Sequence, residues 1–241
     1  MTRDLLWRGM LAGILAALAA MLFARAFAEP QVDLAIAFEA AHAAHHDMPS
    51  PAVDDVELVS RATQKGLGLG TALILYGAAV GGLFSLVFAF GYGRMSRQGP
   101  RAYALLLGTF AFVAIALVPA IKYPATPPAV GQHETVALRT IAYFGMIGVS
   151  LIALVLAIRL KPLLDRWFDG FGSIIGAALA YVAIIALAQF GLPPINEVPS
   201  NFPATLLWDF RVASLGTQLV LWIVLSLSFG AMARRLLLSG R

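Results

Sequence analysis

Residues 67–90 read LGLGTALILYGAAVGGLFSLVFAF and contain no Asp, Glu, Lys or Arg. A helix needs roughly 20 mostly apolar residues to cross a bilayer. This stretch therefore predicts a transmembrane helix. Within it, Gly77 and Gly81 are four residues apart, a spacing of small residues that predicts close packing against another helix.

Five further stretches have the same apolar character, and they lie at 5–28, 103–121, 136–158, 172–190 and 212–233. The whole chain is 60% hydrophobic and 12% charged, whereas a soluble domain carries about 25% charged residues. We therefore expect an all-α, polytopic membrane helix bundle of about six transmembrane helices. No loop is long enough to bury a core of its own, so we expect a single integral membrane domain over residues 1–241.

The charged residues between the spans indicate an orientation. If both termini are cytoplasmic, eleven of the 17 Lys and Arg but only three of the 13 Asp and Glu lie on the cytoplasmic side. Lys and Arg collect in cytoplasmic loops. We therefore expect both termini to be cytoplasmic, with the basic residues facing membrane lipid and no nucleic-acid partner.

The first span has a second interpretation. The beginning of the chain resembles a secretory signal with its cleavage site: it has two arginines, Arg3 and Arg8, then an apolar run, and then Ala26-Phe27-Ala28. However, the apolar run is longer than the roughly 7–15 residues of such a signal. We favour an uncleaved anchor; cleavage would leave the mature N-terminus outside.

The longest connection, residues 29–65, lies outside in this orientation. Residues 32–46 are rich in alanine, which favours a helix. Pro49 and Pro51 end that helix, and residues 53–64 predict a second short one. We therefore expect a short extracytoplasmic helical hairpin between the first two spans.

Imidazoles and carboxylates gather in this outer segment. On a helix, residues 39, 42, 45 and 46 fall within an arc of about 120°, and two histidines four residues apart can approach one metal ion. Divalent transition metals accept imidazole and carboxylate ligands. The candidate metal ligands are Glu39, His42, His45, His46, Asp47 and, from the second outer loop, His133. The alternative is a solvated segment whose histidines bind nothing.

A second group of polar side chains lies at or near the outer ends of the spans. Arg139 and Arg211 can pair with Asp209, Glu134 or Glu197, or can extend toward lipid headgroups. The Glu57–Arg61 pair can equally be a surface ion pair of little energetic weight. The candidates for a polar path or for ion pairs are Glu57, Arg61, Gln64, Arg139, Tyr143, Asp209, Arg211 and Gln218.

Several kinds of chemistry are excluded. The chain has no cysteine, which excludes thiolate metal sites and disulfides. It has no phosphate-binding loop ending in Gly-Lys-Ser/Thr and no His-Glu-x-x-His motif. We therefore expect no enzymatic activity and no tightly bound cofactor.

The chain resembles the CbtA family of predicted bacterial cobalt transporter subunits over essentially its whole length. The residues that carry the resemblance are Val59-Ser60-Arg61 with Gln64, Gly81-Gly82-Leu83-Phe84, Lys122-Tyr123-Pro124, Arg139 with Tyr143, Phe202-Pro203-Ala204 and Leu207-Trp208-Asp209-Phe210-Arg211. The resemblance implies a multi-pass protein of the bacterial cytoplasmic (inner) membrane. It also implies a small single-span CbtB-like partner subunit with a histidine-bearing end, and it assigns no metal ligands. Homo-oligomers are a further kind of assembly open to such a chain.

We therefore expect a membrane subunit for uptake of a divalent metal ion, cobalt(II) in particular, captured at the outer His/carboxylate cluster. Cobalt(II) or a similar divalent metal would be the transported ion. The alternative is a non-transporting membrane subunit that organises a complex, with the histidines incidental.

Overall fold

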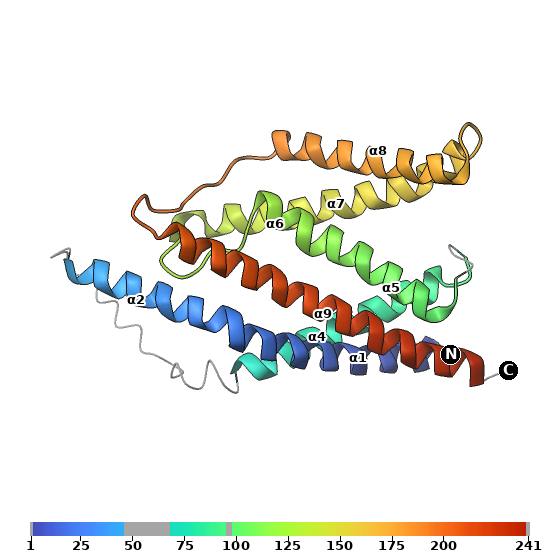
Figure 1. Cartoon of the computed structure of the whole chain (residues 1–241), viewed down its shortest axis with the longest axis horizontal. Coiled ribbons are helices and arrows are strands. Elements are labelled where there is room, and N and C mark those ends of the chain that lie inside the picture. Colours follow the sequence, from blue (N-terminus) through green and yellow to red (C-terminus); the bar gives the residue numbers. More distant parts are fainter. Residues whose placement is uncertain (1, 46–67, 95–97, 240–241) are drawn as a thin grey trace. The chain divides into compact units, whose positions relative to one another are not determined.

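The computed structural model describes residues 2–45, 68–94 and 98–239, and within these ranges it leaves the side chains of residues 42–45, 69, 133 and 239 undescribed. Helices make up the regular structure of this part of the chain (Figure 1). The helices are α1 (Thr2–Phe23), η1 (Ala24–Ala28), α2 (Glu29–His45), α4 (Leu69–Gly91), α5 (Pro100–Ala111), η3 (Phe112–Leu117), α6 (Val118–Lys122), η4 (His133–Thr135), α7 (Val136–Leu164), α8 (Gly170–Gly191) and α9 (Ala204–Ser239).

Six helical stretches are long and apolar enough to cross a membrane, which confirms the predicted all-α bundle of six spans. They are Thr2–Ala41, Gly70–Gly91, Pro100–Lys122, Val136–Leu164, Gly170–Gly191 and Ala204–Leu238. Two helices extend well beyond the predicted spans. The last helix, α9, begins at Ala204 rather than at residue 212. Pro203 stands just before its start. A backbone N–H at that position would have no intrahelical partner, so a proline, which has no N–H, is tolerated there.

The first helical stretch also runs further than predicted. Helical backbone continues without a break from Thr2 through η1 to His45, and Figure 1 shows α2 continuing from the end of α1. The first arm of the predicted hairpin is therefore helical but joined directly to the first span. The second arm, residues 53–64, lies outside the described residues, so the hairpin stays a prediction.

Each of the two π-helical turns ends two residues before a proline. The π turn η1 ends at Ala28, two residues before Pro30, and η3 ends at Leu117, two residues before Pro119. A proline inside a helix removes one hydrogen bond, and its ring clashes with the carbonyl four residues earlier. A wider turn relieves that clash, so each helical stretch passes its proline without ending.

Contacts divide the chain into two compact units, which are described separately below. Unit 1 contains residues 1–111, 127–129 and 204–241, and unit 2 contains residues 112–126 and 130–203. The prediction of a single membrane domain stays a prediction.

In unit 1, glycines bring α1 and α4 into backbone contact. A Cβ atom at Gly13 would overlap the carbonyl group of Gly77, and one at Gly81 would lie 2.8 Å from the Cα of Gly13. A Cβ at Gly9 would likewise overlap Gly81 O. The predicted close packing at Gly77 and Gly81 is thus confirmed, and the partner is a second pair of glycines four residues apart on an antiparallel helix.

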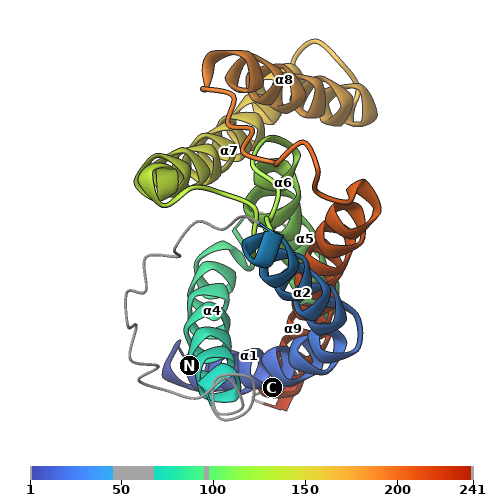
Figure 2. The same ribbon diagram turned by 90° about the vertical axis from the view of Figure 1, so that its left-hand side faces the viewer.

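An aromatic cluster joins α4 and α5 to α9 in the same unit. Phe88 and Phe229 are fully buried, and their ring centroids lie 5.0 Å apart in an edge-to-face arrangement. Tyr103 of α5 lies 5.2 Å from Phe88. Figure 2 shows α4 and α9 of unit 1 beside α1. Edge-to-face rings contribute about 0.5–1.5 kcal/mol beyond the area they bury.

In unit 2, α7 and α8 pack side by side around a small core (Figure 1). Met146 and Ala153 of α7 are fully buried with Ile185 of α8. The hydroxyl groups of Ser150 and Tyr181 form a 2.8 Å hydrogen bond between the two helices. At its start, α8 is capped by the Asp169 side chain, whose Oδ1 accepts a 2.7 Å hydrogen bond from the Gly172 N–H.

Candidate functional site

The predicted metal-capture cluster lies where α2 ends. Helical backbone carries residues 39, 42 and 45, so their three-residue spacing places them along one face of α2. The Glu39 side chain is exposed. The side chains of His42 and His45 are not described, and His46 and Asp47 lie outside the described residues.

The predicted ligand from the second outer loop is His133. It begins the short helix η4, directly before α7; its side chain is not described. Among the residues that the structure does describe, no group of three or more His, Asp and Glu side chains is arranged to hold a metal ion. The metal cluster therefore stays a prediction that rests on ligand chemistry and helical spacing.

A polar network in unit 2 ties the loop before α7 to the loop after α8. Arg139 Nε lies 3.5 Å from Glu197 Oε2, and the same oxygen accepts a 2.9 Å hydrogen bond from the Gln132 backbone N–H. Arg139 Nη2 also lies 3.4 Å from Gln132 O. Of the three carboxylates considered for Arg139, Glu197 is the one that lies beside it.

The charge of Glu197 is stabilised by its neighbours. The Thr135 hydroxyl and the Gln132 N–H, followed by the charge of Arg139, hold the pKa of the Glu197 carboxyl below its usual range despite partial burial. The Glu197 side chain is 10% exposed, whereas that of Arg139 is 28% exposed. The network is therefore an ionised, largely covered contact between two loops.

Gly131 makes this contact possible. Its φ angle is +112°, a conformation that residues with a Cβ rarely adopt. A Cβ atom there would also overlap the guanidinium group of Arg139. The glycine thus allows both the turn before α7 and the close approach of the arginine.

Lys122 and Tyr123 form a second brace to the end of α8. Lys122 Nζ donates a 2.5 Å hydrogen bond to Gln189 O, and the Tyr123 hydroxyl donates a 2.9 Å bond to Pro193 O. A cation at the C-terminal end of a helix satisfies an orphan carbonyl and interacts favourably with the helix dipole. Sequence reasoning missed both contacts. The available signal was an adjacent Lys and Tyr at the end of an apolar run.

Tyr143 lies one turn after Arg139 but does not extend the network. Its ring is half buried against the apolar core of unit 2 and meets Phe144 edge to face at 5.8 Å. The spacing of four residues therefore places both side chains on one face of α7, but Arg139 contacts the polar network and Tyr143 contacts the apolar core.

The other polar candidates belong to unit 1 or are not described. Arg211 Nε on α9 is buried and has no hydrogen-bond partner in the described part of the chain. Asp209 is exposed and Gln218 is partly buried on the same helix; no ion pair joins Asp209 to Arg211 within the described ranges. Glu57, Arg61 and Gln64 lie outside the described residues.

Comparison with known proteins gives one family. No curated protein and no solved structure matches the chain. The model of one family, described as "Probable cobalt transporter subunit (CbtA)", matches residues 2–234. That description names transport rather than catalysis, and the match covers all six membrane-spanning candidates except the last few residues of α9. The chain therefore belongs to the CbtA family of probable cobalt transporter subunits.

Proposed function

We propose that this chain is a membrane subunit for uptake of a divalent metal ion, with cobalt(II) as its cargo. The observation that carries the proposal is the family match over residues 2–234, whose description names cobalt transport. Six apolar helices provide the membrane scaffold that such a subunit requires. We place the chain in the bacterial cytoplasmic membrane with both termini cytoplasmic, on the basis of its charge distribution.

The capture step is assigned to the end of α2 and the residues that follow. Glu39, His42 and His45 occupy one helix face in a segment that the charge distribution places outside. Imidazole and carboxylate are ligands that cobalt(II) accepts. In this proposal, the chain first holds the ion at these groups, together with His46 and Asp47.

The network of unit 2 supports this role by fixing the loops around His133. The Arg139–Glu197 contact holds the loop before α7 against the loop after α8. The bonds of Lys122 and Tyr123 hold the end of α6 against the end of α8. A braced loop presents a ligand at lower entropic cost than a free one does. His133 is therefore proposed as a later ligand for the incoming ion.

The second candidate is a non-transporting subunit that organises a complex. Each candidate span contains an 18-residue window with at most two charged residues, and the Ser150–Tyr181 bond of unit 2 is one of the polar contacts between helices. A charged ion crosses a bilayer along polar or ionisable groups. This composition favours a chain that completes a transport path together with a partner, such as a single-span subunit or a second copy of itself.

Uptake of cobalt(II) by the purified full-length chain in liposomes separates the two candidates. We expect the chain alone to carry cobalt(II) into liposomes faster than protein-free liposomes take it up, with competition from nickel(II) and zinc(II) reporting selectivity. Uptake that equals the protein-free control, and rises only when a single-span partner is added, would favour the organising subunit. Binding of cobalt(II) by titration reports capture separately from transport.

A further inference from the structure

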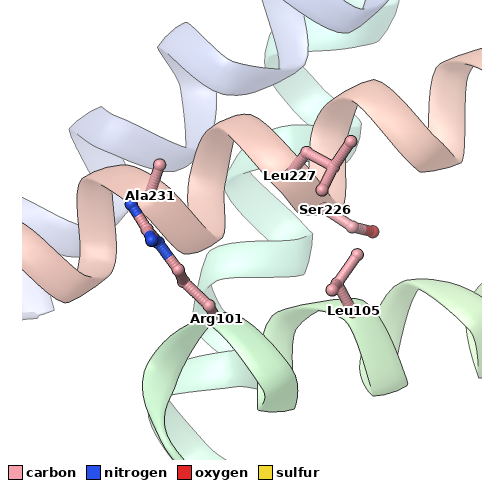
Figure 3. A pocket seen from close by; sticks show the side chains of 5 residues that line it. All are labelled: Arg101, Leu105, Ser226, Leu227 and Ala231. Carbon is pink, nitrogen blue, oxygen red and sulfur yellow. The ribbon is translucent and has the colours of Figure 1, made fainter.

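A pocket of about 290 Å³ lies between α5 and α9 of unit 1 (Figure 3). Its lining comes from the first turns of α5 and the C-terminal part of α9, and consists of Arg101, Leu105, Ser226, Leu227 and Ala231. Figure 3 shows the Arg101 side chain reaching from α5 toward Ala231 on α9. The pocket therefore has a cationic group on one side and aliphatic side chains beside it.

The two polar groups of the pocket differ in what they can still bind. Ser226 Oγ donates its proton to Trp222 O at 2.7 Å, so that hydroxyl is already used. Arg101 is exposed, and its guanidinium group forms no hydrogen bond or ion pair with the rest of the described chain. Its charge is therefore free to meet an anion, while the remaining lining is apolar.

This pocket lies at the most basic end of unit 1. Helix α1 runs antiparallel to α4, because Gly9 meets Gly81 and Gly13 meets Gly77. Helix α5 runs antiparallel to α9, because Gly108 meets Ser226 and Gly230 meets Ala104. Phe84 and Phe88 contact Trp222 and Phe229 in the same order, so α4 and α9 run in parallel.

The start of α1, the end of α4, the start of α5 and the end of α9 therefore share one end of unit 1. The described arginines there are Arg3, Arg8, Arg94, Arg101, Arg234 and Arg235, and the one described acid is Asp4. Such a surface attracts anionic lipids, and each basic residue near a membrane surface adds to the attraction. The positive end of the α5 dipole also lies beside Arg101.

We propose that this pocket binds an anionic phospholipid. The phosphate contacts Arg101 at the start of α5, and the first carbons of an acyl chain lie against Leu105, Leu227 and Ala231. The pocket combines an uncompensated cation with apolar side chains at the end of a membrane-spanning helix. An amphiphile with a negative headgroup matches both features. A soluble anion matches only the cation and would leave the aliphatic lining exposed to water. The assignment is independent of the proposed transport function.

The test measures lipid binding to the purified full-length chain in a zwitterionic detergent by native mass spectrometry. The probes are phosphatidylglycerol, phosphatidylcholine and inorganic phosphate. The variants are Arg101→Gln, which removes the charge, and Ala231→Leu, which fills the pocket. Arg3→Gln is the matched control, because Arg3 is exposed at the same end of unit 1 and does not line the pocket.

We expect phosphatidylglycerol to bind more tightly than phosphatidylcholine, and the affinity to fall about fivefold in Arg101→Gln, the effect of one basic group at a membrane surface. Ala231→Leu should also weaken binding, and Arg3→Gln should leave it nearly unchanged. If Ala231→Leu expresses poorly, Leu227→Phe narrows the same pocket from a half-exposed position. Equal losses in Arg101→Gln and Arg3→Gln, equal binding of the two lipids, or displacement of the lipid by inorganic phosphate would each overturn the proposal.

Discussion

Arg139 of α7 and Glu197 of the loop after α8 lie 3.5 Å apart, and Gln132 bridges them through its backbone. The two residues are 58 positions apart in sequence, and the contact joins the start of α7 to the loop after α8. Arg139 lies in the first turn of α7. An arginine is tolerated in this membrane-spanning stretch because its charge is met by a carboxylate within the protein rather than by lipid.

Breaking this pair should lower the stability of the folded chain. Arg139→Ala leaves the largely covered Glu197 carboxylate without its cation, so we expect the melting temperature in detergent to fall by a few degrees. Removing one partner of a covered pair is more harmful than removing both. The double variant Arg139→Ala/Glu197→Gln should therefore melt above Arg139→Ala alone. Equal melting temperatures for the parent and Arg139→Ala would show that the contact contributes nothing.

The two arginines at the ends of spans should respond differently to replacement. Arg211 Nε is buried without a hydrogen-bond partner in the described residues, and a buried polar group without a partner destabilises the fold. Arg211→Met should therefore keep or raise the melting temperature, in contrast to Arg139→Ala. A marked fall in Arg211→Met would indicate that Arg211 has a partner that purified chain retains.

The Glu197 network should also make stability depend on pH. The folded-state pKa of Glu197 is lowered, first by the Thr135 hydroxyl, so its stabilising effect is present above the unfolded value of about 4.3 and is lost as the pH falls through the folded value. We expect the melting temperature of the parent to exceed that of Glu197→Gln at pH 6. The difference should shrink steadily below about pH 4.3. A constant difference from pH 6 to pH 3 would contradict the ionised contact.

The glycine contact between α1 and α4 predicts a position-specific effect of side-chain size. A Cβ at Gly81 would meet backbone atoms of α1, whereas one at Gly145 of α7 would meet nothing within 4 Å. Gly81→Val should therefore separate the helices and abolish or strongly reduce folded protein, measured by size-exclusion chromatography in detergent. Gly145→Val is the matched control and should elute like the parent. Similar behaviour of the two variants would rule out the close packing.

The parts of the fold that the sequence predicts are those with a repeated, local signal. Long, mostly apolar runs predict all six spans, and Gly77 with Gly81 predicts a close helix contact. The extent of the helices was less predictable. The first predicted span stops at residue 28, just before Pro30, whereas the π turn η1 lets the helical stretch continue past that proline. No local sequence pattern predicts that a helix will continue past a proline in this way.

The site shows the same difference between local and long-range information. Arg139 stood out because a charge near the start of a span is unusual, but its partner had three candidates until the loops were placed. Lys122 and Gln189 are 67 residues apart, and the acceptor is a backbone carbonyl, which carries no signature in the sequence. Contacts of this kind depend on how the helix ends meet in space.

The sharpest prediction concerns the metal-capture cluster. Binding needs neutral imidazoles, so cobalt(II) affinity should weaken below roughly pH 6, near the unperturbed histidine pKa of about 6.5. The double variant His42→Ala/His46→Ala should have a lower affinity for cobalt(II) and a lower uptake at limiting cobalt(II), because each substitution removes one proposed ligand. We expect expression to change little, because surface substitutions usually alter stability by within about 0.5 kcal/mol.

The measurement is isothermal titration of the parent and the double variant with cobalt(II) at pH 5.5 and 7.5. His133→Ala, tested alongside, reports whether the loop before α7 adds a ligand to the same ion. A further test variant, Glu39→Gln, keeps the size of the side chain, removes one acidic ligand from the exposed face of α2 and should also weaken binding. If the parent and the double variant bind equally, with no dependence on pH, the histidines are incidental. The chain would then act by organising a partner rather than by capturing the ion itself.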